Sequence, residues 1–338
     1  MKTVLLTSDP LYPPNCVSDP LFPPNLVSAL VARLATLAGR TLVVTGGSRG
    51  IGLAIAKRAA ADGANIVIAA KTAAPHATLP GTIHTAAKEC EEAGAPKALA
   101  IQCDIMDDAA IERMVAATVG EFGGIDILIN NASAIDNSGM LDVRAKKYHL
   151  MHQINGRGTF WTSKLCLPHL LKSSNPHVLN LSPPLDLDPR WFKIGGVAYT
   201  MAKYNMSMCA LGMAEEFKGQ VAFNCLWPRT AIATAAIKML AGELGVSASR
   251  SVDIMADAAH WILTQRSGEC SGNTFIDDEV LTQRAGMSEA DLDKYRVSRL
   301  VPLMPDFYVG DPAALEKYVD GARKMQGMVG AFTSAFKK

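Results

Sequence analysis

An excess of charge of one sign is the first thing this sequence lacks. Its 338 residues include 33 Lys and Arg against 32 Asp and Glu, so the formal net charge is +1. Proteins that bind nucleic acid or anionic membranes usually carry a basic excess or a basic patch. We therefore expect neither nucleic acid nor an anionic membrane surface as a partner.

Long hydrophobic runs and sorting signals are also missing. No stretch approaches the roughly 18 apolar residues of a membrane span. The apolar start of the chain is broken at Asp9 and Pro10, before the core of a signal peptide could form. The last residues, 335–338, do not form a peroxisomal SKL-type signal. We expect no membrane span and a cytoplasmic protein, with peroxisome or mitochondrion open for a eukaryotic source.

Cysteine and histidine do not occur in metal-binding patterns. None of the seven cysteines forms a CxxC pair, and none of the seven histidines belongs to an HxxxH or HExxH pattern. An odd number of scattered cysteines in a large domain is typical of reduced thiols. We expect no disulfide framework and no metal site.

The residues that are present predict a main domain with an extension at each end. Hydrophobic residues make up 49% of the chain, enough for a sizeable core. Near the start, a Pro-Pro-containing octapeptide at 8–15 recurs at 18–25, and such pairs favour extended chain. We expect an extended arm and short helix over 1–37, a main domain over 38–285 and a helical extension over 286–338. Asp311 and Pro312 predict the start of a helix towards Phe336, which packs on the domain or closes over its pocket.

Strand and helix patterns alternate through the main domain. Short β-branched or apolar runs predict strands at 41–45, 65–70, 98–103, 125–129, 177–181, 220–226 and 273–277. Segments with helical spacing lie between them, at 51–61, 109–122 and 198–217 among others. Such alternation predicts an α/β fold, a doubly wound parallel (Rossmann) sheet of seven strands with helices on both faces. Ligands of these sheets bind beyond the carboxyl ends of the strands.

A glycine-rich loop follows the first predicted strand and opens the next helix. Glycines there permit a tight turn and let backbone N–H groups approach a pyrophosphate at the helix N-terminus. A plain strand-to-helix turn is the alternative, but the position in the first βαβ unit favours a dinucleotide site and makes 38–285 a dinucleotide-binding catalytic domain. The residues expected to contact the cofactor here are Gly46, Ser48, Arg49, Gly50, Ile51 and Gly52.

The end of the second strand predicts which dinucleotide is bound. NAD-binding units place a carboxylate on the ribose hydroxyls about 20 residues after the glycines. This sequence has Lys71 there, and Arg49 lies in the glycine loop. Two cations suit a 2′-phosphate, so we expect NADP(H). The alternative is that both are solvated surface charges.

Tyr199 and Lys203 are the candidate proton-transfer pair. Spaced by four within a predicted helix, they share one face. A phenol titrates near ~10, and an adjacent ammonium, helped by an oxidised nicotinamide, would lower that pKa towards neutrality. Elsewhere, Asp104 follows the third strand and either meets the adenine or caps a helix. Asn131 follows the fourth strand, where asparagine is often only a turn residue.

Several features are informative when they are taken together: the TGGSRGIG and NNAS segments, Asn155, YTMAK and Pro228. With these features the chain resembles the short-chain dehydrogenase/reductase family, over about residues 38–280. The resemblance implies a proton relay from Tyr199 through Lys203 and Asn155, with Lys203 also holding the nicotinamide ribose. It also implies a homodimer or homotetramer paired through the tyrosine helix and its predecessor at about 146–172. Further cofactor contacts implied by it are Asp104, Ile105, Asn131, Ala132, Ser133, Pro228 and Thr230.

Two positions depart from the family pattern. Pro183 stands where the family has its catalytic serine, with Ser182 one residue earlier; Ser182 either reaches the substrate carbonyl or is a strand-end hydroxyl. Arg229 stands where the family usually has glycine, and either binds an acidic substrate group or points into solvent.

These patterns predict an NADP(H)-dependent carbonyl reductase or alcohol dehydrogenase acting on a small-molecule substrate. An apolar or lipid-like substrate is expected from Trp191, Phe192, Trp227 and a mobile-looking loop over 184–197. A non-catalytic NADP(H)-binding sensor or assembly subunit is the alternative. A lipid carrier is disfavoured, because we expect a reductase domain without a sterol-carrier domain.

Overall fold

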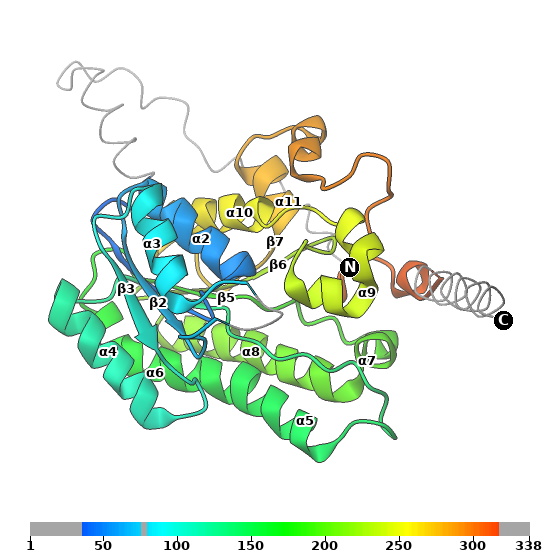
Figure 1. Ribbon diagram of the computed structural model, residues 1–338, viewed down its shortest axis with the longest axis horizontal. Coiled ribbons are helices and arrows are strands. Elements are labelled where there is room, and N and C mark those ends of the chain that lie inside the picture. Colours follow the sequence, from blue (N-terminus) through cyan, green and yellow to red (C-terminus); the bar gives the residue numbers. More distant parts are fainter. Residues whose placement is uncertain (1–35, 76–79, 318–338) are drawn as a thin grey trace, which may run out of the picture. The chain divides into compact units, whose positions relative to one another are not determined.

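The computed structural model describes residues 36–75 and 80–317 (Figure 1). The chain divides into two units, residues 1–36 and 37–338, and the fold described here is that of the second. The predicted arm over 1–37 and most of the predicted helix towards Phe336 lie outside the described residues.

A seven-stranded, all-parallel sheet forms the centre of this unit, with the strand order β3-β2-β1-β4-β5-β6-β7. The order runs outwards in both directions from β1 and β4, so the sheet is doubly wound and the predicted fold class is confirmed. The strands are β1 (Thr41–Thr45), β2 (Asn65–Ala70), β3 (Ala98–Gln102), β4 (Ile127–Asn130), β5 (His177–Asn180), β6 (Ala222–Trp227) and β7 (Thr274–Ile276).

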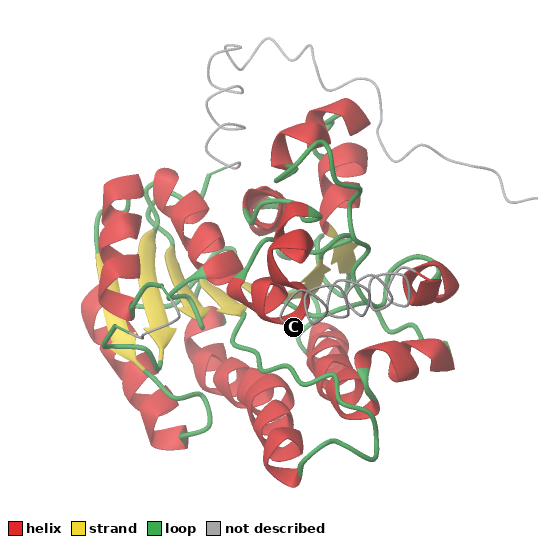
Figure 2. Ribbon diagram, turned by 45° about the vertical axis from the view of Figure 1, so that its right-hand side comes forward, coloured by secondary structure: helices red, strands yellow, loops and turns green. Residues whose placement is uncertain are grey.

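Helices cover both faces of the sheet (Figures 1 and 2). On one face lie α2 (Gly50–Ala61), α3 (Ile83–Ala93) and α10 (Asp253–Thr264); on the other lie α4 (Asp108–Phe122), α6 (Thr159–Leu170) and α8 (Val197–Glu216). The remaining elements are α5 (Ala145–Met151), the π-helix η1 (His152–Gly158), α7 (Pro189–Gly195), α9 (Ala235–Ser247), α11 (Asp277–Glu279), the π-helix η2 (Val280–Arg284) and the 3₁₀-helix η3 (Glu289–Tyr295).

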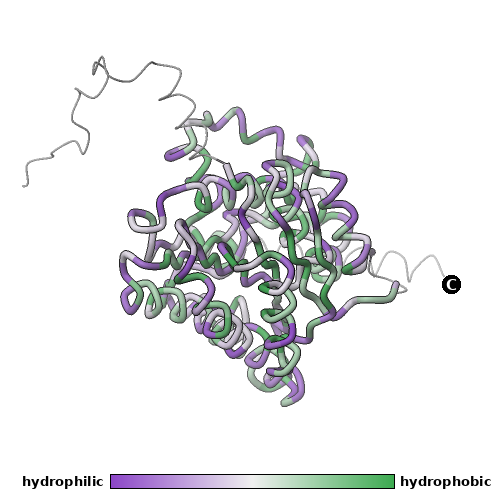
Figure 3. Tube along the Cα trace, turned by 90° about the vertical axis from the view of Figure 1, so that its left-hand side faces the viewer, coloured by the Kyte–Doolittle hydropathy of each residue, from purple (hydrophilic) through white to green (hydrophobic). Residues whose placement is uncertain are grey.

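Two apolar cores result from this layering. Successive side chains of a strand point to opposite faces, so Leu42 and Val44 of β1 pack under α2 and α10, whereas Val43 packs against the α4 and α6 side. Both faces are buried, which is why the strands are almost wholly apolar. Figure 3 shows these hydrophobic segments inside the unit, with hydrophilic loops around them.

The helical stretch before β5 is not uniform, although the sequence predicts one helix there. It runs as α5, then the π-helix η1, then α6. Gly156 in η1 lies against Asn205 of α8, where a Cβ would come within 2.8 Å of the Asn205 side-chain Cγ. The missing side chain lets η1 approach the tyrosine helix closely.

The described part of the C-terminal extension returns to the carboxyl end of the sheet. After η3 it runs without regular structure to a helical segment that begins at 312. Thr230, after β6, pairs with Pro305 in an isolated antiparallel bridge. Residues 304–307 of this part line the pocket described next.

Candidate functional site

A cavity of about 1600 Å³ lies at the carboxyl ends of the strands, where the fold class predicts a ligand site. Its walls come from the loops after β1, β2, β3, β4 and β6, from α8 and α9, and from the C-terminal extension. The predicted site residues that line it are Gly46, Ser48, Arg49, Gly50, Ile51, Lys71, Asp104, Ile105, Asn131, Ala132, Ser133, Tyr199, Lys203 and Pro228.

The glycine loop is built for close backbone approach. Gly46 and Gly50 adopt left-handed backbone conformations, with φ of +64° and +59°, which favour glycine. A Cβ on Gly46 would lie 2.9 Å from the Ala132 Cα, and one on Gly52 would lie 2.5 Å from the Asn131 Nδ2. Gly52 therefore makes room for the Asn131 side chain beneath the loop, and it does not line the cavity. The bare loop at the start of α2 is a cradle that fits a pyrophosphate.

Asn131 holds this loop in place from the neighbouring strand. Its Nδ2 donates to the carbonyl oxygens of Thr45 (2.9 Å) and Gly46 (3.1 Å). In return, the Thr45 Oγ1 accepts the backbone N–H groups of Asn131 and Ala132, each at 3.1 Å. The asparagine thus does more than end a strand, because it fixes β1 and β4 together at the cavity.

The two cations expected for a 2′-phosphate, Arg49 before α2 and Lys71 after β2, line the cavity together with the Asp104 carboxylate after β3. The Arg49 guanidinium donates to the carbonyl oxygens of Pro80 (2.9 Å) and Gly81 (3.0 Å). Lys71 lies 3.7 Å from the Asp104 carboxylate, and both side chains are partly exposed. Asp104 also accepts the Met106 N–H (3.0 Å), whereas the cap of α4 is Asp107. The helix-cap alternative for Asp104 is therefore wrong.

Tyr199 and Lys203 lie side by side in the buried wall of the cavity, on α8. The Lys203 Nζ donates to the Leu181 carbonyl (2.8 Å) and lies 5.0 Å from the centre of the Trp227 ring. Burial lowers the pKa of Lys203 to about 7, against the opposing effects of the Asp306 carboxylate and the Cys225 thiol.

The phenol of Tyr199 behaves differently from the sequence-based expectation. Burial raises its pKa well above the usual value, and the nearby Tyr308 and Asp306 raise it further. The chain's own groups therefore keep Tyr199 protonated, and no lowering by Lys203 is found. The sequence could not show the burial, nor that the C-terminal extension brings a carboxylate and a second phenol to this wall.

Comparisons with known proteins agree with this geometry. The short chain dehydrogenase family model matches residues 40–241. This chain belongs to the short-chain dehydrogenase family. It is 55% identical over 300 residues to hydroxysteroid dehydrogenase-like protein 2 of Danio rerio, and the match covers 88% of this chain and 70% of that protein. It is 52% identical over 285 residues to the human protein of that name, and this match covers 84% of this chain and 67% of the human protein.

Solved structures show the same fold. A short chain dehydrogenase of Mycobacterium thermoresistibile is 48% identical, with a TM-score of 0.76 over 82% of this chain and 97% of the other. A metagenomic short-chain oxidoreductase solved with NADP is 23% identical, with a TM-score of 0.58 over 71% and 97%, and supports the fold alone.

Besides Gly52, three residues predicted for the site of this short-chain dehydrogenase do not line the cavity. Asn155 is fully buried in η1, where its side chain exchanges two hydrogen bonds with the backbone of Ala134 (2.8 and 3.0 Å). The hydroxyls of Ser182 and Thr230 are buried, and that of Thr230 has no hydrogen-bond partner among the described residues. Ser182 lies at the Cys225 thiol, inside the wall. Since proline follows it, the strand end delivers no hydroxyl to the cavity.

Arg229 is paired with acidic residues of the chain, which neither of its two expected roles included. Its Nε donates to both carboxylate oxygens of Asp278 (2.8 Å each), and its Nη2 contacts Glu279. Its guanidinium is therefore paired within the chain, while 36% of the side chain stays exposed.

The 184–197 loop is also more ordered than expected. It contains α7, and Trp191 within it is fully buried with its indole donating to Asp186 (2.8 Å). Of the three aromatic residues named for the substrate wall, only Trp227 lines the cavity.

Sequence reasoning missed two contributors to the site. Asn180 of β5 accepts from Asn130 (2.8 Å) and donates to the Met206 carbonyl on α8 (2.9 Å), which ties the tyrosine helix to the sheet. Asp306 lines the cavity from the C-terminal extension. Asn180 could have been noticed as an asparagine at a strand end, but Asp306 lies in an irregular segment without a recognisable motif.

Within residues 36–75 and 80–317, no group of His, Cys, Asp and Glu side chains could hold a metal ion. Over the same residues, no helix is long and apolar enough to cross a bilayer.

Proposed function

We propose that this short-chain dehydrogenase is an NADP(H)-dependent carbonyl reductase or alcohol dehydrogenase. The observation that carries the proposal is the shared cavity: the glycine loop lies at one part of its wall, and Tyr199 and Lys203 lie at another. The first feature suits a dinucleotide pyrophosphate, and the second suits proton exchange with an oxygen of the substrate.

NADP(H) would be held by the residues that line the cavity from the glycine loop to the end of β2. The start of α2 has Arg49 as its N-cap residue, without a capping hydrogen bond from the side chain, so its first N–H groups are available to a pyrophosphate. Lys71 and Arg49 supply positive charge for a 2′-phosphate. When bound, the nicotinamide supplies or accepts the hydride.

The chain's own residues handle the proton. Tyr199, kept protonated by its surroundings, donates its proton to the carbonyl oxygen in the reductive direction. Lys203 holds the nicotinamide ribose, as the family resemblance implies, and its positive charge stabilises the phenolate that remains. The relay beyond Lys203 passes along η1 at Asn155, whose side chain fixes the loop after β4.

The substrate is proposed to be apolar. Around Tyr199, the cavity is lined by Ile135, Ile194, Trp227 and Phe307. The name of the similar vertebrate proteins points to hydroxysteroids as a first class to test.

Replacing Tyr199 by Phe tests the mechanism. We expect turnover to fall by ~10²-fold or more, with NADPH affinity little changed, because the hydroxyl alone is removed. Initial rates on a panel of steroid, retinoid and aliphatic carbonyls provide the measurement, and Tyr148→Phe on α5 is a matched control. Near-normal turnover in Tyr199→Phe would exclude this mechanism. A Michaelis constant for NADH below that for NADPH would exclude the cofactor assignment.

A second candidate is an NADP(H)-binding protein without turnover. The observation in its favour is Ser182, whose hydroxyl lies outside the cavity. NADPH binding without activity on the whole panel would support this candidate over the enzyme.

A further inference from the structure

A short segment of the C-terminal extension, residues 304–308, forms part of the cavity wall. Its first four residues line the cavity. The Met304 carbonyl accepts the Ala231 N–H (2.9 Å), and the Asp306 N–H donates to the Arg229 carbonyl (3.0 Å). These hydrogen bonds attach the segment to the loop after β6.

Tyr308 holds the end of this segment in the core. Its side chain is 1% exposed, and its hydroxyl lies 3.0 Å from the Thr200 Oγ1 on α8. Its ring centre lies 5.3 Å from that of Tyr204 and 5.9 Å from that of Trp191. Its φ of +67° makes it the single non-glycine residue with positive φ among those described. Such a conformation persists only where the surroundings fix it, so the backbone next to Phe307 has a fixed position.

Phe307, one residue earlier, borders the Tyr-Lys pair. It lines the cavity, and its ring meets that of Tyr308 edge-on at 5.9 Å between centres. It packs against the apolar cluster that contains Tyr199 and Trp227. The Trp227 indole donates to the Phe307 carbonyl (2.8 Å), and the Trp227 ring centre lies 5.0 Å from the Lys203 Nζ. Phe307 is therefore joined through Trp227 to the site of proton transfer.

This position brings Phe307 against the substrate. A carbonyl oxygen that takes a proton from Tyr199 must come within about 2.6–3.2 Å of its hydroxyl, so the substituents of the carbonyl fill the adjoining part of the cavity. Three other apolar side chains of that part come from the stretch that the family model matches: Ile135, Ile194 and Trp227. Phe307 lies beyond residue 241, where the match ends. It is the contribution of this chain's own extension.

We infer that Phe307 is a specificity-determining residue, whose ring limits the width of the substituents that a substrate can carry at its carbonyl or hydroxyl carbon. The inference rests on the proposed function, because it takes Tyr199 as the group that meets the reacting oxygen. A ring on a fixed backbone excludes a wider substituent, since overlap would force well-packed side chains out of their preferred rotamers.

Steady-state kinetics of the full chain test the inference, with two variants that change the wall in opposite directions. The probes are the widest and the narrowest substrates of the steroid, retinoid and aliphatic panel that the wild type turns over. The measured quantity is the ratio of kcat/KM for the wide substrate to kcat/KM for the narrow one. We expect Phe307→Ala to raise this ratio by about 10- to 100-fold and Phe307→Trp to lower it.

Phe192→Ala is the matched control. Phe192 packs against the same apolar cluster but does not line the cavity, so its removal should leave the ratio unchanged. The affinity for NADPH, followed by nicotinamide fluorescence, should be the same in all variants, because the glycine loop is untouched. Phe307→Trp keeps a large apolar ring against the cluster, so it decides the question even where Phe307→Ala fails to fold.

Two results would overturn the inference while leaving the proposed function intact. One is a ratio that stays at the wild-type value in the Phe307 variants. The other is a ratio that moves in the same direction in both, which indicates a general disturbance of the fold. A wild type that binds NADPH but turns over no substrate of the panel would instead overturn the proposed function, and the inference with it.

Discussion

At the scale of single residues, Arg229 shows how a departure from a family pattern is accommodated. Three consecutive acidic residues after β7 bind it. Asp278 and Glu279 accept hydrogen bonds from its guanidinium, and the Asp277 Oδ1 accepts one from its backbone N–H (2.9 Å). Asp278 also binds Arg250 (3.1 Å). The cation that stands in place of glycine therefore joins the loop after β6 to the end of β7.

Replacing Arg229 by Met should weaken the fold and spare cofactor binding. The change leaves the buried Asp278 with one cation in place of two, which we expect to cost about 1–3 kcal/mol of unfolding free energy. Urea denaturation measures this cost, and the Michaelis constant for NADPH should stay unchanged. Arg266→Met, which removes an exposed partner of Glu269, should cost little. A large rise in the Michaelis constant without loss of stability would mean that Arg229 faces a ligand.

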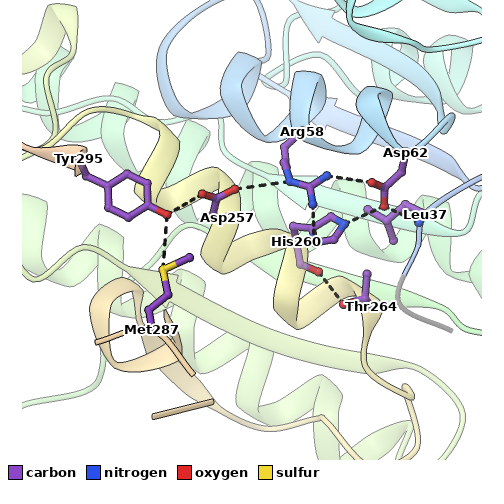
Figure 4. A network of polar contacts seen from close by, with 8 residues as sticks. All are labelled: Leu37, Arg58, Asp62, Asp257, His260, Thr264, Met287 and Tyr295. Atoms are coloured by element: carbon purple, nitrogen blue, oxygen red, sulfur yellow. Dashed lines mark hydrogen bonds and ion pairs between the residues drawn. The ribbon is translucent and has the colours of Figure 1, made fainter. Parts of the chain in front are cut away.

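At the scale of elements, α2 and α10 are joined by a polar network remote from the glycine loop (Figure 4). Asp62, after α2, accepts from Arg58 (2.9 Å), the Leu37 N–H (2.9 Å) and the His260 Nε2 (2.7 Å). Arg58 has only donors, so the His260 Nδ1 at 3.2 Å is an acceptor and its Nε2 carries the proton. Arg58 also reaches Asp257, which accepts from the Tyr295 hydroxyl (2.6 Å), so η3 is tied in as well.

This network predicts a pH dependence of stability. Burial alone would raise the pKa of Asp62, but the hydrogen bonds from His260, Leu37 and Arg58 outweigh it and lower the pKa. The pKa of Asp62 in the folded state lies below its unfolded value of about 3.9. The contribution of this carboxylate to the stability of the fold is therefore fully present above that pH. It is lost as the pH falls through the folded-state pKa.

Asp62→Asn should therefore cost about 1–3 kcal/mol at neutral pH and flatten the loss of stability below about pH 4. Thermal unfolding across an acid series measures both effects. Glu92→Gln, an exposed change on α3, is the control. An equally steep acid limb in Asp62→Asn would show that other carboxylates dominate acid unfolding.

Most elements could be predicted from the sequence, because the pattern of each is local. β1 and β2 coincide with the predicted runs, and α8 differs from its prediction by one residue at each end. The π-helix at Asn155 could not be predicted, because it arises from packing against Ala134 and Asn205, which lie far away in the sequence. Asp306 was missed for the same reason: its place in the cavity wall depends on the hydrogen bonds that hold residues 304–308 against the loop after β6 and on the burial of Tyr308.

At the scale of the whole molecule, α6 and α8 carry large apolar side chains that the described chain leaves uncovered. Met201, Met208 and Leu211 on α8 and Phe160 on α6 are exposed, whereas Met206 is fully buried. The methionines of α8 thus differ in environment, because Met206 lies in the core whereas Met201 and Met208 lie on the surface. An exposed apolar surface of this kind is typical of a subunit contact, and we propose a homodimer or homotetramer through these helices.

Met208→Glu should break such an assembly, because it buries a charge in an apolar contact. Light scattering coupled to size exclusion should show the mass falling to that of one chain, 36.0 kDa. Leu300→Glu, at a leucine of the C-terminal extension that is 95% exposed against 63% for Met208, should leave the mass unchanged. A monomeric wild type would refute the proposed assembly.

The segment of residues 304–308 also affects the order in which this molecule completes its cavity. Its hydrogen bonds join residues about 75 positions apart, from 229 to 306, and contacts between distant segments form late because the intervening loop must first close. During synthesis the glycine loop and the tyrosine helix leave the ribosome well before Asp306, which lines the same cavity. A nascent chain therefore has its glycine loop and its tyrosine helix in place before residues 304–308 complete the wall of the cavity.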